Sequence, residues 1–409
     1  MATATMTYRY SVRDRSGKMV TGTIDADSPT AVASKLKSMG YAPVSIAAQK
    51  NAGLSMELKL PKLGSSVKLK DLAVFSRQFA TMINAGLSLL RALTILEEQT
   101  SSKALAATLT EVRQDVETGQ SLSVALSRHP KIFPPLMVNM TRAGEVGGFL
   151  DSVMLQIAEN YEAEVKLRGK VKSAMTYPVV VFCIAILAVV GMLLFIVPVF
   201  AKMFKTLGGE LPFPTRVLIE ASHLLKILAP LLVVGVIVGM IVWQRIKHQE
   251  RVRSVIDPIK LKLPIFGNLF QKIAISRFAR NLGTMLSSGV PILQSLDIVS
   301  DTTGNIVLAH AIRDVQESVR RGESLTAPLA MHPVFPPMVV QMMAVGEDTG
   351  ALDAMLHKIS EFYDQEVEST TESLTALIEP LMIAVLGALV GSMIIALYMP
   401  IFKIFNLIQ

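Results

Sequence analysis

Apolar and polar positions follow helical spacing along most of this 409-residue chain, and the pattern occurs in two copies. Residues 75–96 and 278–299 share their apolar positions at an offset of 203, and residues 142–153 return as 344–355 at an offset of 202. Each copy then passes through a Tyr-x-x-Glu-Val element and ends in a long apolar segment. Self-similarity at a fixed offset indicates a duplicated structural unit, so any function has to be argued for the pair.

Within each copy, the apolar spacing predicts helices that bury one face. In the first copy, Phe75, Phe79 and Met82 follow one another at three- or four-residue intervals, as positions on one helix face do. Glycines interrupt this pattern, and about six short helices per copy fit between them. The last helix, which begins near Leu150 or Leu352, is expected to run on toward the apolar segment, so that movement of the helical part could reach it mechanically.

Glycines at matching places in the two copies predict the turns between these helices. Gly86 and Gly289 stand where the apolar pattern breaks, and Ser88 and Pro291 follow them as residues that favour the start of the next helix. The predicted turn glycines are Gly86, Gly119, Gly144, Gly148, Gly289, Gly322, Gly346 and Gly350.

Three uncharged stretches are long enough to cross a bilayer. They cover residues 173–201, 227–244 and 380–402, whereas roughly 20 apolar residues are needed to cross the hydrocarbon core. Composition agrees, because 51% of the residues are apolar and the mean hydropathy is +0.46. The fold class is therefore predicted as an all-α membrane protein with two helical bundles and three transmembrane helices.

The first 48 residues have a different pattern and predict a small α+β module. Residues 7–14 and 19–26 alternate as strands do, Ser28 and Pro29 can start a helix that ends at Gly40, and residues 43–46 return to the sheet. This gives a ββαβ unit at residues 1–48, followed by a linker at residues 49–66 that contains glycine and proline.

Charge predicts the orientation of the spans. Basic residues at 166–172 precede the first span and basic residues at 245–253 follow the second, as expected for cytoplasmic flanks. The predicted order is a first cytosolic bundle (67–172), a span (173–201), a periplasmic loop (202–226), a span (227–244), a second cytosolic bundle (245–379), a span (380–402) and a short external tail (403–409). The net charge of +7 reflects this orientation, and no direct nucleic-acid binding is expected.

The sequence has no catalytic motif. It contains no Gly-rich phosphate loop, no dinucleotide fingerprint, no His-Glu-x-x-His motif and no Cys/His cluster with zinc spacing. None of the three predicted spans contains Asp, Glu, Lys or Arg, the residue types that mark ion and proton pathways in membranes. We therefore expect a protein that is not an enzyme, needs no cofactor or metal, and moves no solute through its own helices.

Two pairs of repeated charged residues are candidate partner contacts. Glu145 and Glu347 each follow a glycine near a predicted turn, where the carboxylate either caps the following helix together with a nearby aspartate or faces a partner. Arg77 and Arg280 repeat on the first helix of each bundle, where they form an intramolecular ion pair or contact a partner.

Glu379 is a candidate of a different kind, because it directly precedes Pro380 at the mouth of the third span. A carboxylate is costly there unless it is hydrated or paired. It either reaches toward the membrane surface or faces the charged N-terminal end of a client transmembrane helix.

These features resemble the polytopic inner-membrane platform proteins of type IV pilus assembly and type II secretion, a family with relatives in DNA-uptake pili. The resemblance is carried by the Phe-Ser-Arg-Gln-Phe and Phe-Ala-Arg-Asn-Leu openings at residues 75–79 and 278–282, both Gly-Glu dipeptides, the N-terminal module and the order of the spans. The second copy lacks one residue near positions 332–336, which alters only a loop.

The resemblance implies a mechanical role in the cell inner membrane. The implied partners are a cytosolic hexameric assembly ATPase, pilin or pseudopilin subunits, other inner-membrane assembly proteins and the lipid bilayer. The duplication also favours a homo-oligomer. We expect the first bundle and the N-terminal module to face the ATPase, and Glu379 with the third span to lie nearer the pilins.

An alternative from another class is a membrane subunit of a transporter driven by a separate ATPase. The odd number of spans, their apolar lining and the large soluble bundles argue against it. A membrane-bound scaffolding or signalling protein is a third possibility, but it leaves the duplication unexplained.

Overall fold

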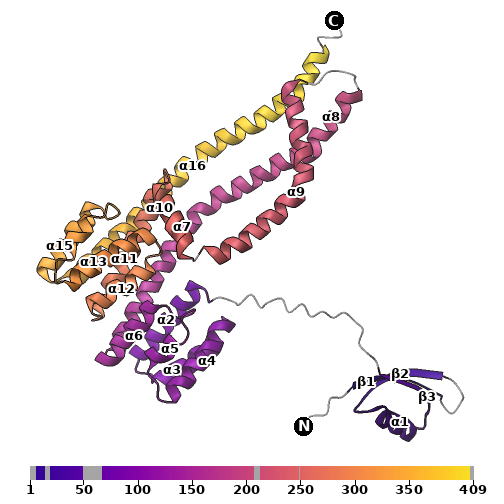
Figure 1. Cartoon of the computed structure of the whole chain (residues 1–409), viewed down its shortest axis with the longest axis horizontal. Helices are drawn as coiled ribbons and strands as arrows, with labels where there is room; N and C mark the ends of the chain where they lie inside the picture. Colours follow the sequence, from indigo (N-terminus) through magenta and orange to yellow (C-terminus); the bar gives the residue numbers. More distant parts are fainter. Residues whose placement is uncertain (1–5, 14–18, 49–66, 207–211, 248, 406–409) are drawn as a thin grey trace. The chain divides into compact units, whose positions relative to one another are not determined.

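The computed structural model describes residues 6–13, 19–48, 67–206, 212–247 and 249–405. The chain divides into two units, residues 1–64 and residues 65–409, which are considered separately below (Figure 1). The predicted linker at residues 49–66 and the end of the predicted tail, residues 406–409, lie outside the described residues.

The N-terminal unit is a three-stranded antiparallel sheet with one helix. Its elements are β1 (Met6–Arg13), β2 (Met19–Ala26), α1 (Pro29–Ser38) and β3 (Ala42–Ala48), with strand order β2-β1-β3. The Ser28 hydroxyl accepts a hydrogen bond from the Ala31 N–H at 3.2 Å and so caps α1. Tyr8 and Val12 of β1 pack against Val32 and Leu36 of α1 in a small core, and the predicted ββαβ module is confirmed.

Two bundles of six helices form the second unit, in the same order in each copy. The first bundle consists of α2 (Leu69–Asn84), α3 (Leu89–Gln99), α4 (Lys103–Glu117), α5 (Leu122–Ser127), α6 (Pro135–Gly147) and α7 (Leu150–Gly191). The second consists of α11 (Phe266–Ser287), α12 (Ile292–Thr302), α13 (Ile306–Arg320), α14 (Thr326–Ala330), α15 (Pro337–Thr349) and α16 (Leu352–Phe405). Between them the chain forms the π-helix η1 (Met192–Ile196), α8 (Val197–Thr206), α9 (Phe213–Ile246) and α10 (Glu250–Lys262).

Most of the predicted turn glycines end helices in the left-handed conformation. Gly86 has a φ of 82° and Gly289 a φ of 72°, which a side chain would disfavour, and each lies between the first and second helix of its bundle. The other four of this kind are Gly119, Gly148, Gly322 and Gly350.

The turn prediction is wrong for Gly144 and Gly346, which lie inside α6 and α15. A Cβ atom on Gly144 would stand 3.1 Å from Leu150 Cα, and one on Gly346 would stand 2.9 Å from Leu352 Cα. Glycine is needed at these two places because the following helix passes close to the backbone. The sequence signal, a glycine beside an acid, does not distinguish close packing from a turn.

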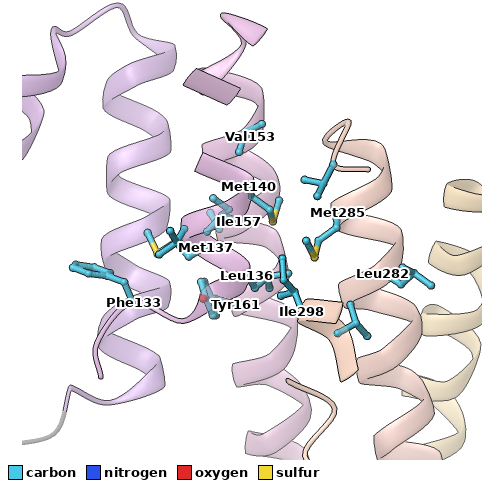
Figure 2. Packing of buried hydrophobic residues seen from close by; sticks show 14 of the residues in the cluster. Phe133, Leu136, Met137, Met140, Val153, Ile157, Tyr161, Leu282, Met285 and Ile298 are labelled. Atoms are coloured by element: carbon cyan, nitrogen blue, oxygen red, sulfur yellow. The ribbon is translucent and has the colours of Figure 1, made fainter. Parts of the chain in front are cut away.

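A single apolar core runs through both bundles. Leu136 and Met140 of α6 project from the first bundle toward Met285 of α11 and Ile298 of α12 in the second, as Figure 2 shows. All four side chains are less than 8% exposed. The bundles are therefore held together by apolar burial as well as by polar contacts.

Three helical segments are long and apolar enough to cross a membrane: Leu150–Met203, Phe213–Ile246 and Leu352–Pro400. They contain the first two predicted spans and all but the last two residues of the third, and the prediction of an all-α membrane protein with an N-terminal strand module is confirmed. The segment predicted as a periplasmic loop, 202–226, is mostly helical, because α8 continues to Thr206 and α9 begins at Phe213. Charged residues suggested a loop there, but apolar residues among them keep helical spacing, and both α8 and α9 extend into this segment.

The last helix of each bundle continues without a break into an apolar span (Figure 1). Helix α7 has 42 residues and starts at Leu150, and α16 has 54 residues and starts at Leu352, where the sequence predicted both starts. At 1.5 Å per residue these helices are about 60 and 80 Å long.

Polar contacts also join the spans to one another. The Thr215 hydroxyl of α9 donates to the Ala396 carbonyl oxygen of α16 at 2.5 Å. The Ser222 hydroxyl of α9 donates to the Leu193 carbonyl oxygen of η1 at 2.6 Å. Such hydrogen bonds fix neighbouring helices where no water competes for the donors.

Candidate functional site

The contact between the bundles forms a polar site beside the shared apolar core. The Asn160 amide of α7 donates to Asn281 Oδ1 at 3.2 Å and to Thr284 Oγ1 at 3.3 Å, both on α11. Gln294 of α12 donates to Asn139 Oδ1 of α6 at 2.8 Å. Asn160 and Thr284 also line a cavity of about 440 Å³, so the two bundles meet at a polar, hydrogen-bonded seam.

A charged cluster lies where this seam approaches the membrane. Glu164 of α7 accepts from Arg277 of α11 and from Arg168 of its own helix, each with an N···O distance of 2.6 Å. Arg280 Nη1 lies 3.8 Å from the second Glu164 oxygen. Burial alone would raise the pKa of Glu164, but Arg277, Arg168 and Arg280 together lower it. This carboxylate is therefore held in its charged form as the junction of the two bundles.

The two repeated arginines make equivalent ion pairs. Arg77 donates to both carboxylate oxygens of Glu162 at 2.7 and 2.6 Å. Arg280 forms its hydrogen-bonded ion pair with Asp364, which stands at the position of Glu162 in the second copy. The hydrogen bond to Glu162 raises the pKa of Arg77.

The surroundings of the two pairs differ. The Arg77 side chain is 36% exposed, whereas that of Arg280 is 7% exposed beneath α7. Both cations already have partners within the chain. A contact with another protein would be an additional role for these residues.

Glu145 and Glu347 are helix caps, but not of the helices that the sequence indicated. The Glu145 carboxylate accepts from the backbone N–H groups of Leu122 at 2.5 Å and Ser123 at 3.0 Å, at the start of α5. Glu347 accepts from the Leu325 N–H at 2.7 Å, at the start of α14. Each acid therefore reaches back to the preceding helix and satisfies its free N–H groups.

Capping of the following helix, which was one of the two alternatives drawn from the sequence for these acids, is thus wrong. The actual partners lie 22 or 23 residues earlier in the chain, a separation that local sequence rules do not cover.

Glu379 lies inside α16 and its side chain is exposed. No hydrogen bond or ion pair is formed by Glu379 with the described part of the chain. The position keeps a free carboxylate directly before Pro380, at the start of the third predicted span.

Sequence reasoning missed the charges that join the last helices to the second bundle. Besides the Glu164–Arg277 pair, Lys170 of α7 pairs with Glu368 of α16, and Lys272 of α11 pairs with Glu366 of α16 at 2.7 Å. A signal was present, because Glu164 and Glu366 are the glutamates of the repeated Tyr-x-x-Glu-Val element. Their partners could not be identified without the packing of the bundles.

An apolar cavity of about 320 Å³ lies between α7 and α16 within the membrane-spanning part. Every residue that lines it is apolar: Phe182, Ala185, Ile186, Val189, Val190, Leu381, Met382, Val385, Leu386 and Leu389. Such a lining fits a hydrocarbon chain or an apolar helix and offers no site for an ion. Within the described residues, no three His, Cys, Asp or Glu side chains gather as a metal site.

Comparison with protein families matches both halves of the chain to one family. The family model described as Type II secretion system (T2SS), protein F matches residues 75–198 and again residues 278–400. The model of the N-terminal domain of type II secretion system protein F matches residues 1–47. The three matched segments reproduce the duplication and the strand module that the structure shows.

Curated relatives align over nearly the whole chain. The type IV pilus assembly protein PilC of Thermus thermophilus is 46% identical over 399 residues, which is 97% of this chain and 98% of the relative. PilC of Myxococcus xanthus is 42% identical over 409 residues, covering 99% and 97% of the two chains. The type II secretion system protein F of Xanthomonas campestris pv. campestris is 32% identical over 405 residues, covering 98% and 99%.

Proposed function

Because this chain belongs to the type II secretion system protein F family, we propose that it couples a cytosolic assembly ATPase to the extraction of pilin subunits from the inner membrane into a growing fibre. In this role the protein is a mechanical platform and not an enzyme. Its N-terminus lies in the cytoplasm, as the basic flanks of the first two spans favour.

The observation that carries this proposal is the continuity of α7 and α16. Each helix begins at the tip of a bundle, packs along that bundle and continues into an apolar span. A helix is stiff between its prolines, so a displacement of the bundle by a motor is transmitted along α7 and α16 to Pro178 and Pro380, where the apolar spans begin. The seam at Glu164 and Arg277 couples the two helical levers, so that they move together.

The exposed tip of the first bundle is the proposed docking surface for the ATPase. Val146, in the last turn of α6, is 85% exposed, whereas the matching position in the second bundle is the charged Asp348. Phe149, three residues further on, is 39% exposed, and two neighbouring exposed apolar side chains at one tip favour a protein partner on the first bundle. The N-terminal unit is proposed to contribute to the same contact.

The proposed surface for the pilins lies on the third span. The apolar cavity between α7 and α16 supports it, because an apolar helix could pack there. Glu379 stands just outside the cavity with a free carboxylate that could pair with a positively charged helix terminus. Other inner-membrane assembly proteins are expected around the remaining faces of the spans.

The experiment is cross-linking in native membranes, followed by purification through a C-terminal tag and identification of partners by mass spectrometry. We expect a hexameric assembly ATPase linked to the first bundle and a pilin-like protein linked to the spans. Recovery of a solute-binding protein or a transporter nucleotide-binding subunit instead would favour the transporter alternative and contradict the proposal.

A pair of matched variants tests whether the ATPase docks on the first bundle. V146E places a charge on the tip of the first bundle, and A351E places one near the matching tip of the second. Glu145 is a poor probe, because reversing its charge would uncap α5. We expect V146E to reduce co-purification of the ATPase and A351E to leave it unchanged; equal effects would contradict the assignment to the first bundle.

A further inference from the structure

The two bundles contact each other through unlike faces. Helices α6 and α7 of the first bundle pack on α11 and α12 of the second, and α7 also packs along α16. The contact with α16 joins non-matching positions too, since Lys170 pairs with Glu368, whose counterpart in the first copy is Lys166. By the repeat, α11 and α12 correspond to α2 and α3, and α6 and α7 correspond to α15 and α16. In the described part of the chain, α2 and α3 make no comparable contact with α15 or α16. The arrangement is therefore head-to-tail and leaves one face of each kind uncovered.

Burial at matching positions shows the two uncovered faces. Thr284 and Ser288 of α11 are 4% and 2% exposed, whereas their counterparts on α2 and just beyond it, Thr81 and Ala85, are exposed. We call the surface on α2 and α3 that contains Val74, Gln78, Thr81, Ala85 and Arg91 the front face; all five of these residues are exposed.

The second uncovered face lies on α15 and α16 and is more apolar than its counterpart. Asn160 is 5% exposed in the seam, and the matching Phe362 is 41% exposed; Val345, which matches Ala143, is 53% exposed. We call the surface formed by Met338, Gln341, Met342, Val345 and Phe362 the back face. An apolar surface of this kind on a protein's exterior marks a contact site.

The acid that corresponds to Glu164 needs no new partner in such a contact. In the seam, Glu164 needs Arg277 of the opposite bundle. Its counterpart Glu366 is already paired with Lys272 of its own bundle, and the position that matches Arg277 on the front face is Val74. Docking the front face on the back face would therefore leave Glu366 with its cation, although Val74 stands where the seam has Arg277.

The spans permit the same contact to be repeated in one membrane. Helices α7 and α16 run side by side in the same direction, since Lys170 pairs with Glu368 and residues 182–190 line a cavity with residues 381–389. The operation that relates the bundles therefore keeps both on the same side of the membrane. Repeating it between chains preserves that orientation.

We propose that a second copy of this chain docks its front face on the back face, in a contact that copies the seam between the two bundles. This inference names the surfaces of the homo-oligomer expected from the duplication, and it does not depend on the proposed role in fibre assembly. Because the contact is head-to-tail, the chains form a ring if the rotation closes. Each copy then contacts one neighbour through its front face and the other through its back face.

The test uses the positions that match a known contact of the seam. Gln294 donates to Asn139 within the chain, and their counterparts are Arg91 on the front face and Gln341 on the back face. Single variants R91C and Q341C, each with Cys183 replaced by serine and each with a different tag, are co-expressed and treated in membranes with a short bis-maleimide. The N139C/Q294C variant is the matched positive control for linkage within one chain.

We expect a linked dimer that carries both tags, and no linked dimer when either single variant is expressed alone. The double variant R91C/Q341C should give products larger than a dimer. Linkage of either single variant to itself would indicate a two-fold contact and overturn the proposal. Failure of the mixture to link while N139C/Q294C links, or linkage of R91C to a different protein, would overturn it as well.

A second measurement reports the affinity between copies, whereas cross-linking reports the proximity of two side chains. F362E places a charge on the exposed back face and should weaken association roughly thirtyfold, as the loss of a central aromatic anchor does. V124E, on the exposed surface of α5 and on neither face, is the control. Light scattering of the detergent-solubilised protein measures the mass. A mass unchanged by F362E would contradict the back face as a contact.

Discussion

Glu164 forms an ion pair with Arg277, with an N···O distance of 2.6 Å. Glu164 lies on the last helix of the first bundle and Arg277 on the first helix of the second. The two side chains are only 12% and 23% exposed. They lie where the helices that enter the membrane come together, next to the pair formed by Lys170 and Glu368. The link between the two copies is thus electrostatic at the membrane end of the seam and apolar farther from it, at Leu136 and Ile298.

We predict that R277A destabilises the protein by about 2–3 kcal/mol, because it leaves Glu164 buried with less compensating charge. The expected fall in melting temperature is roughly 5 °C, measured by thermal unfolding in detergent. R168A is the matched control. It removes a cation from the same carboxylate, but its side chain is 57% exposed and it does not join the bundles, so a smaller effect is expected. Equal effects would contradict a special role for the contact between bundles.

The Glu164 carboxylate should also make the stability of the fold depend on pH. The pKa of Glu164 is lower in the folded protein than its ordinary value of 4.5, so the folded state is stabilised above that value and loses this contribution as the pH falls through the lowered pKa. E164Q should reduce stability at pH 7 and flatten the fall in stability below about pH 4.5. An unchanged acid profile in E164Q would show that other carboxylates cause the acid sensitivity.

Arg280 and Arg77 occupy matching positions but should respond differently to substitution. The Arg77–Glu162 pair is exposed on the bundle surface, and we expect R77A to cost about 0.5 kcal/mol. R280A removes a buried cation from Asp364 and from the vicinity of Glu164, so a loss of about 3 kcal/mol is expected. The difference between the two melting temperatures measures what burial by the other bundle adds. Similar values for both variants would contradict this interpretation.

Much of the fold could be predicted from the sequence because its signals are local or repeated. The N-terminal strands, the cap at Ser28, the six-helix repeat and the starts of the long helices at Leu150 and Leu352 all follow from spacing and from turn residues. The family, too, could be identified, since ordered motifs run along nearly the whole chain.

What could not be predicted depends on contacts between distant segments. Gly144 has the same local context as a turn glycine, but its role is set by the approach of Leu150. Glu145 caps a helix that begins 23 residues earlier. The seam itself joins residues more than 100 positions apart, such as Asn160 and Asn281, and no periodicity in either copy indicates which faces meet.

Glu347 provides a test of the capping role. Burial alone would raise the pKa of Glu347, but hydrogen bonds from the Leu325 N–H and from Ser324 and Thr326 lower it on balance. E347A should destabilise the second bundle by about 1 kcal/mol through loss of the cap. The effect should fade as the pH falls below 4.5 and the native carboxylate is protonated. D348A, on the neighbouring exposed side chain, should change stability little; a loss as large as that of E347A would contradict the cap.

Glu379 should matter for fibre assembly and not for folding, since its carboxylate has no partner in the described part of the chain. We expect E379Q to unfold at the same temperature as the unmodified protein and to assemble fewer fibres, counted by electron microscopy. E372Q removes an equal charge two turns earlier on the same exposed face of α16 and should leave the number of fibres unchanged. A normal number of fibres in E379Q would contradict the proposed contact with pilins.

Pro178 and Pro380 interrupt the backbone hydrogen bonding of the two long helices at matching positions, near the start of each apolar span. Each proline lies inside its helix, and the two are related by the repeat offset of 202. Each removes the hydrogen bond to a carbonyl four residues earlier, that of Ala174 or Ala376, so both helices can bend where their apolar spans begin. If the protein works by moving one long helix against the other, this flexibility is part of the mechanism.

P380A should restore a helical hydrogen bond, keep or raise the melting temperature, and still reduce fibre assembly. The control is P230A in α9, a helix that does not extend from a bundle, for which normal assembly is expected. Normal assembly by P380A, with its melting temperature raised, would show that the levers transmit movement as straight rods and that the repeated prolines serve another purpose.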